Sequence, residues 1–384
     1  MAEINEGNNP KVIAFYLPQY HSIPENDEWW GEGFTEWTNV KKAKSLFEGH
    51  DQPKIPLNEN YYYLLDDNVK IWQSNLAKKY GIFGFCYYHY WFKDGKKLLE
   101  KPAEQMLKNK NVDLPFCFCW ANENWSRNWD GGNREIIMEQ QYGYREDWEK
   151  HFQYLLNFFK DQRYITVDGK PLFIIYKPDL IPDIYQMIKF FKKRAIEEGF
   201  AGLCCAFQFP TYYSDLFYRE DIFDYMIGFE PTYSRNTFKK AQSQKINLIR
   251  TVFGENLISK YRKLYSIQNH NSIKPNHLTV FYYDETWESI LKQEWREDFI
   301  PGAFVDWDNT PRNKHGTMYV GFTIEKFKNN MIKLLKRAIK ENKKMIFINA
   351  WNEWAEGAFL EPDNKYGYRK LEAIHDAIKM STEK

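Results

Sequence analysis

The chain has 384 residues, 43% of them hydrophobic and 18% aromatic, and its formal net charge is +1. A nearly neutral chain creates no global field that would recruit nucleic acid or an anionic membrane surface, so neither class of partner is expected. The longest apolar run, at 81–92, is too short and too polar for an integral membrane segment, and the N-terminus lacks the basic and apolar regions of a secretion signal.

The five cysteines all lie in apolar runs that read as strands, and their number is odd. Cys117 and Cys119 lie two positions apart inside one such apolar run and are interpreted as a poor metal pair. We therefore expect buried, reduced thiols, which fits a cytoplasmic protein.

Eight short apolar segments alternate with longer segments of helical periodicity. Several of the apolar segments are continuous runs bounded by Gly or Pro, which is typical of strands buried on both faces. The predicted strands lie at 11–17, 82–90, 115–121, 171–176, 202–208, 224–229, 300–306 and 344–350, and predicted helices include 68–80, 145–160, 182–198 and 323–342.

This alternation predicts an α/β fold in which a single (β/α)8 TIM-type barrel spans residues 11–384 and residues 1–10 form an N-terminal tail. A doubly wound open sheet is the alternative. However, the first strand is followed by PQYH and by no Gly-rich phosphate loop, which disfavours a nucleotide-binding fold.

Two connections are long enough to carry function. Residues 18–67 follow the first strand and are rich in Trp, Glu and Asn, and a loop of that length in a compact domain is usually functional. An insertion before the seventh strand, at about 235–275, carries nine Lys or Arg and one Glu. It is interpreted as a solvated surface, with a patch for an anionic glycan or a lipid-linked glycan carrier as the alternative.

Polar and aromatic residues gather where the predicted strands end. In a barrel of this kind the carboxyl ends of the strands form the active-site face. An oligo- or polysaccharide substrate is expected there, because aromatic rings pack on sugar rings while carboxylates and amides bind hydroxyl groups. The candidate substrate-binding residues are Tyr16, Trp37, Tyr88, His89, Trp91, Trp120, Asn122, Glu123, Trp125, Arg127, Asp306, Trp307, Asn352 and Trp354.

Glu353 and Glu356, in the segment WNEWAEG, are the predicted catalytic pair. Cleavage of a glycosidic bond needs one protonated carboxyl beside the leaving group and a second carboxylate on the sugar side. Two Glu three positions apart lie on one face of a helical turn, with Cβ atoms about 5–6 Å apart. At that range one can stay ionised while the pKa of its neighbour rises. Trp351 and Trp354 are expected to wall this site.

No metal site and no cofactor are predicted. Asp306 and Asp308 resemble the D-x-D motif of metal-dependent sugar-nucleotide transferases, but sugar-hydroxyl binding is the favoured interpretation, and the histidines show no ligand spacing. Arg127 and Arg312 are expected to pair with anionic groups of a substrate or with acids at the same rim. Glu123 is interpreted as a hydrogen-bond anchor, with a third catalytic carboxylate as the alternative.

Four long segments resemble one known family. They are AFYLPQYHSIPENDEWWGEGFTEWTNV at 14–40, KYGIFGFCYYHYWF at 79–92, PFCFCWANENWSRNWDG at 115–131 and FINAWNEWAEGAFLEPD at 347–363. On these segments the chain resembles the WbsX-like glycosyltransferases, which are related to glycoside hydrolase family 99 of the endo-α-mannosidase type. The resemblance covers nearly the whole chain and implies a carbohydrate-active barrel enzyme connected with lipopolysaccharide or other polysaccharide biosynthesis.

The resemblance also implies separate roles for the two acids. In the hydrolase relatives the corresponding segment supplies both carboxylates, which makes Glu353 the base and Glu356 the general acid/base. The base activates the sugar's own 2-hydroxyl, a 1,2-anhydro sugar forms, and water opens it with retention. Where the endo-mannosidases have His this chain has Ala355, which leaves the substrate open.

Three functions therefore follow from the sequence. The first is a retaining endo-glycosidase that acts on a bacterial surface polysaccharide. The alternatives are a glycosyltransferase of O-antigen or capsular polysaccharide biosynthesis, and a non-catalytic glycan-binding barrel.

Overall fold

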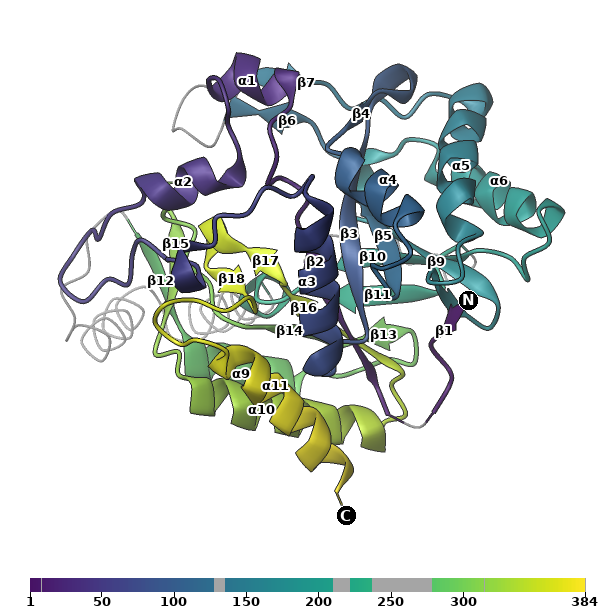
Figure 1. Cartoon of the computed structure of the whole chain (residues 1–384). Helices are drawn as coiled ribbons and strands as arrows, with labels where there is room; N and C mark the ends of the chain where they lie inside the picture. Colours follow the sequence, from purple (N-terminus) through teal and green to yellow (C-terminus); the bar gives the residue numbers. More distant parts are fainter. Residues whose placement is uncertain (8, 128–134, 210–221, 237–277, 314, 384) are drawn as a thin grey trace, which may run out of the picture.

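Nine parallel strands form a nearly closed barrel (Figure 1), which confirms the predicted TIM-type fold. The computed structural model describes residues 1–7, 9–127, 135–209, 222–236, 278–313 and 315–383. In neighbour order the barrel strands are β13 (Phe299–Ile300), β11 (Tyr225–Gly228), β10 (Cys204–Phe209), β9 (Lys170–Ile175), β5 (Phe116–Trp120), β3 (Gly84–Trp91), β2 (Lys11–Tyr16), β16 (Met345–Asn349) and β14 (Gly302–Phe304).

The seventh predicted strand is interrupted, which is why nine strands replace eight. Pro301 has no N–H to donate, and it separates β13 from β14. β13 pairs with β11 and β14 pairs with β16, so the two halves together close the barrel. At this seam a Cβ on Gly302 would meet the carbonyl oxygen of Gly228 at 1.8 Å, so only glycine allows the two backbones to approach.

The barrel strands are mostly apolar because both of their faces are covered. Every residue of β5 (FCFCW) and of β16 (MIFIN) is buried. This continuous pattern is the one expected of parallel strands that lie between a barrel interior and surrounding helices. The five cysteines lie in these strands, and all are buried and free, as predicted.

Helices cover the outside of the barrel, and α9, α10 and α11 lie together along one side (Figure 1). Those predicted at 68–80, 145–160, 182–198 and 323–342 are present with bounds shifted by at most two residues. The described helices are α1 (Pro24–Trp30), α2 (Glu36–Lys42), α3 (Asp67–Lys79), α4 (Lys101–Lys108), α5 (Arg145–Phe159), α6 (Ile184–Glu197), α9 (Tyr283–Lys292), α10 (Ile324–Lys340) and α11 (Arg369–Thr382).

Helix α10 illustrates how the sequence specifies these elements. The Thr323 hydroxyl accepts a hydrogen bond from the Lys326 N–H at 3.1 Å and caps the helix start. Its buried face carries Phe327, Met331, Leu334, Leu335 and Ala338. Burial of the four large side chains contributes about 6–12 kcal/mol before the entropy of ordering is subtracted. α10 packs chiefly against α11.

Short strands and two short helices lie around the barrel. The predicted tail includes β1 (Ala2–Glu3), which pairs with β8 (Ile165–Val167), and the connection 18–67 contains α1 and α2. The other short strands are β4 (Lys97–Leu98), β6 (Trp125–Ser126), β7 (Ile136–Met138), β12 (Thr279–Tyr282), β15 (Thr317–Val320), β17 (Asn352–Glu353) and β18 (Ala358–Phe359).

Nearly all of the predicted insertion at about 235–275 lies outside the described residues, since 237–277 are not among them. In the part of the chain that is described, no helix has the length and apolar character that a membrane crossing requires.

Candidate functional site

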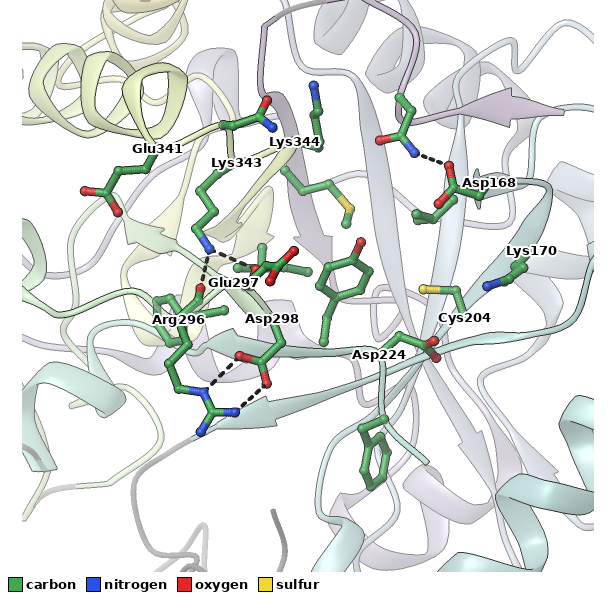
Figure 2. Close-up of a pocket in the computed structure, with 18 residues that line it drawn as sticks. Asp168, Lys170, Cys204, Asp224, Arg296, Glu297, Asp298, Glu341, Lys343 and Lys344 are labelled. Atoms are coloured by element: carbon green, nitrogen blue, oxygen red, sulfur yellow. Dashed lines mark hydrogen bonds and ion pairs between the residues drawn. The ribbon is translucent and has the colours of Figure 1, made fainter. Parts of the chain in front are cut away.

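Two large cavities lie at opposite ends of the barrel. The larger, of about 870 Å³, surrounds the N-terminal ends of the strands and is called the lower pocket; Figure 2 shows its lining. Within its lining Arg296 lies 3.2 Å from Asp298, and Lys343 donates to the backbone carbonyl oxygens of Arg296 and Glu297. TIM-barrel active sites lie at the other end, so the smaller cavity is the candidate.

The smaller cavity, called the upper pocket, has a volume of about 570 Å³ and lies at the C-terminal ends of the strands. Aromatic rings and polar groups share its wall, as expected of a carbohydrate site. It is lined by Leu17, Gln19, Asn26, Trp30, Phe34, Tyr88, Tyr90, Ala121, Glu123, Asn124, Trp125, Ser126, Ile137, Tyr176, Phe229, Thr232, Arg235, Trp307, Asn309, Arg312, Asn313, Glu353 and Glu356.

The backbone after β16 carries both predicted catalytic acids into this pocket. Glu353 ends β17, which pairs with β18, and Glu356 follows in a single 3₁₀ turn. Gly357 closes the turn at a φ of 66°, and a Cβ there would meet the Asp308 backbone nitrogen at 2.9 Å. That same nitrogen donates to the Glu356 carbonyl oxygen at 2.7 Å. The loop after the seventh strand therefore fixes the turn that carries Glu356.

One guanidinium joins the two acids. Arg312 Nη1 lies 2.5 Å from Glu356 Oε1, and Nη2 lies 3.0 Å from Glu353 Oε2. Its Nε donates to Glu36 Oε1 at 2.8 Å. Of the alternatives that the sequence left open for Arg312, the structure places it with acids of the rim. Three fixed contacts hold this planar group, and with it the relative position of the two carboxylates.

Burial dominates the electrostatics of this cluster. It raises the pKa of Glu353 to about 8, an increase that the neighbouring Glu356 and Glu36 carboxylates reinforce and Arg312 opposes. The pKa of Glu356 is raised for the same main reason. Burial acts to lower the pKa of Arg312, but the three carboxylates hold it well above its usual range. At neutral pH the two acids therefore retain a proton while Arg312 stays charged.

The two tryptophans of WNEWAEG lie behind the acids and not on the pocket wall. Trp351 and Trp354 are almost fully buried, and both indole N–H groups donate to Glu361, at 2.9 and 2.6 Å. Tyr62 and Gln73 also donate to Glu361, at 3.0 and 2.7 Å. This buried carboxylate thus collects four donors and fixes the segment between the two tryptophans. Their predicted role as site walls gives way to a supporting one.

Four of the predicted substrate-binding residues do line the upper pocket: Tyr88, Glu123, Trp125 and Trp307. Trp125 packs edge-on against Tyr90, with ring centroids 5.1 Å apart. Glu123 forms an ion pair with Lys177, and its anchoring role stays a prediction. These residues present both flat rings and hydrogen-bonding groups to the cavity.

Several other predicted residues are buried in the packing around the pocket. Tyr16 donates to Gln73 at 2.6 Å and Trp37 to the Tyr62 carbonyl oxygen at 2.8 Å, while Asn352 bonds both backbone groups of Leu17. For Tyr16, on β2, alternation along the strand explains the position, because neighbouring side chains point to opposite faces, whereas Trp37 lies on α2.

A second buried group lies on the outer face of β3 and β5. His89 Nε2 lies 2.9 Å from His151 Nε2, and Trp91 stacks on His151 with centroids 4.6 Å apart. Trp120 donates to the Trp91 carbonyl oxygen at 3.0 Å, and Asn122 donates to the Lys177 carbonyl oxygen at 2.7 Å. None of these predicted residues lines the upper pocket.

Arg127 and Asp306 also lie off the pocket wall. Arg127 is 3.4 Å from Glu135, and its side chain is 41% exposed. Asp306 accepts from the Trp307 N–H at 2.9 Å, while Asp308 accepts from His50 and Gln52, at 2.9 and 2.8 Å. The two acids of the D-x-D motif thus have separate partners. Among the described residues, no group of three His, Cys, Asp or Glu could hold a metal ion.

Glu36 is the main residue that the sequence did not single out. It is fully buried at the start of α2 and completes the set of acids around Arg312. A sequence feature that could have indicated Glu36 was present in the loop 18–67, where the segment FTEW places an acid between aromatic residues. Trp30 and Phe34 of the same loop line the pocket as well.

Comparisons with known proteins extend over nearly the whole chain. The family model described as "Glycosyltransferase WbsX" matches residues 12–374. Two proteins named WxcX and described as uncharacterized, from two strains of Xanthomonas campestris pv. campestris, are each 33% identical over 376 and 377 residues. The match covers 96% of this chain and 49% of theirs, so the chain spans about half the length of these curated relatives.

Two solved structures with a similar fold are described as a glycoside hydrolase and as a glycoside hydrolase-like protein. An endo-α-mannosidase of glycoside hydrolase family 99 from Bacteroides thetaiotaomicron has a TM-score of 0.54, with 98% of both chains covered. A glycoside hydrolase-like protein has a TM-score of 0.53, covering 97% of this chain and 94% of that one. Both are 14% identical to this chain, so the likeness concerns the fold.

Proposed function

The chain belongs to the WbsX glycosyltransferase family, and on that premise we propose that it is a retaining endo-glycosidase acting on a bacterial surface polysaccharide. The observation that carries the proposal is the placement of two carboxyl groups, Glu353 and Glu356, on one guanidinium at the C-terminal end of a barrel. The pKa of each is raised by burial, so the pair keeps a proton for a leaving group at neutral pH.

The proposed reaction uses the pair in two steps. In the first, ionised Glu353 takes the proton from the sugar's 2-hydroxyl, O2 forms a bond to C1, and Glu356 gives its proton to the departing glycosidic oxygen. In the second, Glu356 takes a proton from water, which attacks C1, while Glu353 returns its proton to O2 as the C1–O2 bond breaks. The product is a hydrolysed sugar with retained configuration.

This route requires one proton on the pair, held by Glu356 when the sugar is bound. In the protein without substrate burial raises the pKa of both carboxyls, so the pair retains a proton, and both carboxyls contact the guanidinium of Arg312. Sugar binding is proposed to shift this proton onto Glu356. A 2-hydroxyl donating to Glu353 favours that shift, because a hydrogen bond to the ionised form lowers a carboxyl pKa.

Leaving-group dependence tests both the function and the roles. The two variants Glu353→Gln and Glu356→Gln are assayed on a cleaved glycan and on a glycosyl fluoride of the same sugar, whose departure needs no proton. We expect both variants to lose about 100-fold or more on the glycan, and only Glu356→Gln to recover on the fluoride. Glu288→Gln, at an exposed site on α9, is the matched control. Recovery of Glu353→Gln instead would reverse the roles, and full activity of both would refute the proposal.

A glycosyltransferase of polysaccharide assembly is the second candidate, because the matching family carries that description. In that case the upper pocket would hold an activated sugar, and a lipid-linked glycan is the proposed acceptor. Turnover of a nucleotide sugar with an acceptor, together with no cleavage across a glycan survey, is the result that favours this candidate over hydrolysis. A glycan-binding barrel without catalysis predicts measurable affinity and no product in either assay.

A further inference from the structure

The upper pocket contains a cation that is not neutralised by the acids around it. Two arginines line this cavity. Arg312 is bound to three carboxylates, whereas Arg235 makes no ion pair or side-chain hydrogen bond with any residue that the structure describes. Its Nε is buried from solvent and has no acceptor. A guanidinium in a cavity wall without a partner is poised for an anion.

The acid nearest to Arg235 along the chain is already occupied. Glu230 Oε1 accepts from the Ser234 hydroxyl at 2.9 Å and from Gln293 Nε2 at 2.6 Å, and its Oε2 accepts from the Ser234 N–H at 3.1 Å. These bonds anchor the helical turn at 232–236 against the end of α9. Glu230 therefore positions the backbone that carries Arg235 and leaves the guanidinium without a counter-charge.

Two further buried donors at the upper pocket have no partner among the described residues. The indole N–H of Trp307, which lines the upper pocket, and the hydroxyl of Tyr319 are buried and unbonded among the described residues. The Tyr319 N–H donates to the Trp307 carbonyl oxygen at 2.8 Å, which ties the two residues together. Burial raises the pKa of Tyr319, and the charge of Arg235 acts against that increase, so the guanidinium lies within electrostatic reach of this hydroxyl.

Three unsatisfied donors at the upper pocket, on Arg235, Trp307 and Tyr319, require an explanation. A buried donor that has lost its water without gaining an acceptor destabilises the folded protein, and native structures retain few of them. Where they gather on the wall of a cavity, an acceptor supplied by a ligand accounts for the arrangement. A cation among the three specifies that the acceptor carries negative charge.

We propose that Arg235 and Trp307, with Tyr319 behind them, form a subsite for an anionic group of the saccharide in the upper pocket. The group is an oxyanion, either the carboxylate of a uronic acid or the phosphate of a sugar phosphate. The proposal rests on the proposed function only in that a saccharide occupies this pocket. It makes the substrate an acidic glycan, and Arg235 a residue that selects for charge.

Binding of matched sugar pairs tests the subsite without any cleavage. Glucuronate and glucose, galacturonate and galactose, and mannuronate and mannose differ at one carboxylate each, and glucose 1-phosphate and inorganic phosphate supply the phosphate. Affinities are measured by NMR titration for the wild type, Arg235→Gln, Arg235→Lys and Trp307→Phe. Arg369→Gln, an exposed arginine on α11, is the matched control.

We expect the wild type and the control to prefer an anionic probe over its neutral partner by roughly 10- to 100-fold, the usual gain from a charge-assisted hydrogen bond. Arg235→Gln should abolish this preference, and Arg235→Lys and Trp307→Phe should reduce it. Uronates and phosphates are compared directly, so the probe with the larger Arg235-dependent gain identifies the oxyanion. A wild type that binds no anion in an Arg235-dependent way overturns the proposal.

Stability provides a second readout that separates a ligand role from a structural one. Arg235 is partly exposed and its guanidinium has no partner among the described residues, so Arg235→Gln should leave the melting temperature equal to or above that of the wild type. A lower melting temperature means that Arg235 stabilises the fold and contradicts the subsite.

The subsite and the proposed hydrolase can fail separately. Loss of glycan cleavage in both Glu353→Gln and Glu356→Gln, with no anion preference in the wild type, leaves the hydrolase and removes the subsite. Arg235-dependent anion binding without cleavage of any glycan leaves the subsite and removes the hydrolase.

Discussion

Replacing Glu353 by Gln should stabilise the protein, and the gain should grow with pH. Burial raises the pKa of this carboxyl from 4.5 to about 8, so the folded protein holds the proton more tightly than the unfolded chain does. As the pH rises through this interval, the unfolded chain ionises first and the wild type loses stability. Gln imitates the protonated acid and cannot ionise. Each pKa unit corresponds to about 1.4 kcal/mol.

The expected gain is therefore negligible below about pH 4.5, about 3 kcal/mol at pH 7 and about 5 kcal/mol above pH 8. Glu356 titrates beside Glu353, and these figures treat Glu353 alone. Urea unfolding of the wild type, Glu353→Gln and the surface control Glu288→Gln between about pH 5 and about pH 9 gives the difference directly. A Glu353→Gln protein that is less stable than the wild type, or a difference that does not change with pH, refutes the reasoning.

Three other predictions follow from buried charge. Arg312→Met leaves the acids without their counter-charge, so the free energy of unfolding measured in urea should fall by about 3–5 kcal/mol. The pKa values in the pH–rate profile should rise. An unchanged profile would argue against the role of Arg312 as a bridge between the two acids. Glu361→Gln places an amide N–H against the donors that now point to a carboxylate. The free energy of unfolding should therefore fall by about 2–4 kcal/mol in the same assay, and kcat should fall as well. A variant as stable as the wild type contradicts the hydrogen-bond network around Glu361. Burial lowers the pKa of His89 from 6.5 to about 3, so the wild type should lose at most about 5 kcal/mol of stability as the pH falls through that range. His89→Phe should reduce this dependence of stability on pH. An unchanged dependence would show that His89 is not its source.

The barrel could be predicted because its strands are nearly continuous apolar runs separated by amphipathic helices. Proline lacks the N–H that a strand donates to its neighbour, so the interruption at Pro301 could also have been inferred. However, the segment 300–306 had too few residues to show that it forms two separate strands. α1 and α2 were not predicted because each has only seven residues and no clear helical period. Their aromatic content indicated function without indicating a helix.

The site was predicted unevenly for a physical reason. A strand end shows which residues are near the pocket, but alternation decides which of them face it, and sequence gives the face only when the phase is known. Tyr88 lines the pocket while His89, its neighbour, bonds His151 on the outer side. The contact of Glu36 with Arg312 joins residues 276 positions apart, and no local pattern encodes such a pair.

Closure of the barrel also sets the time at which the site can exist during synthesis. Strand β16 pairs with β2, near the other end of the sequence, so the ring stays open until residues 345–349 have left the ribosome. Until then β2 exposes an unpaired edge, which is where a growing chain is most prone to join a neighbour. Glu353 and Glu356 emerge directly after that strand. A nascent chain therefore acquires the acids and the closed ring together, and a fragment that ends before β16 has neither.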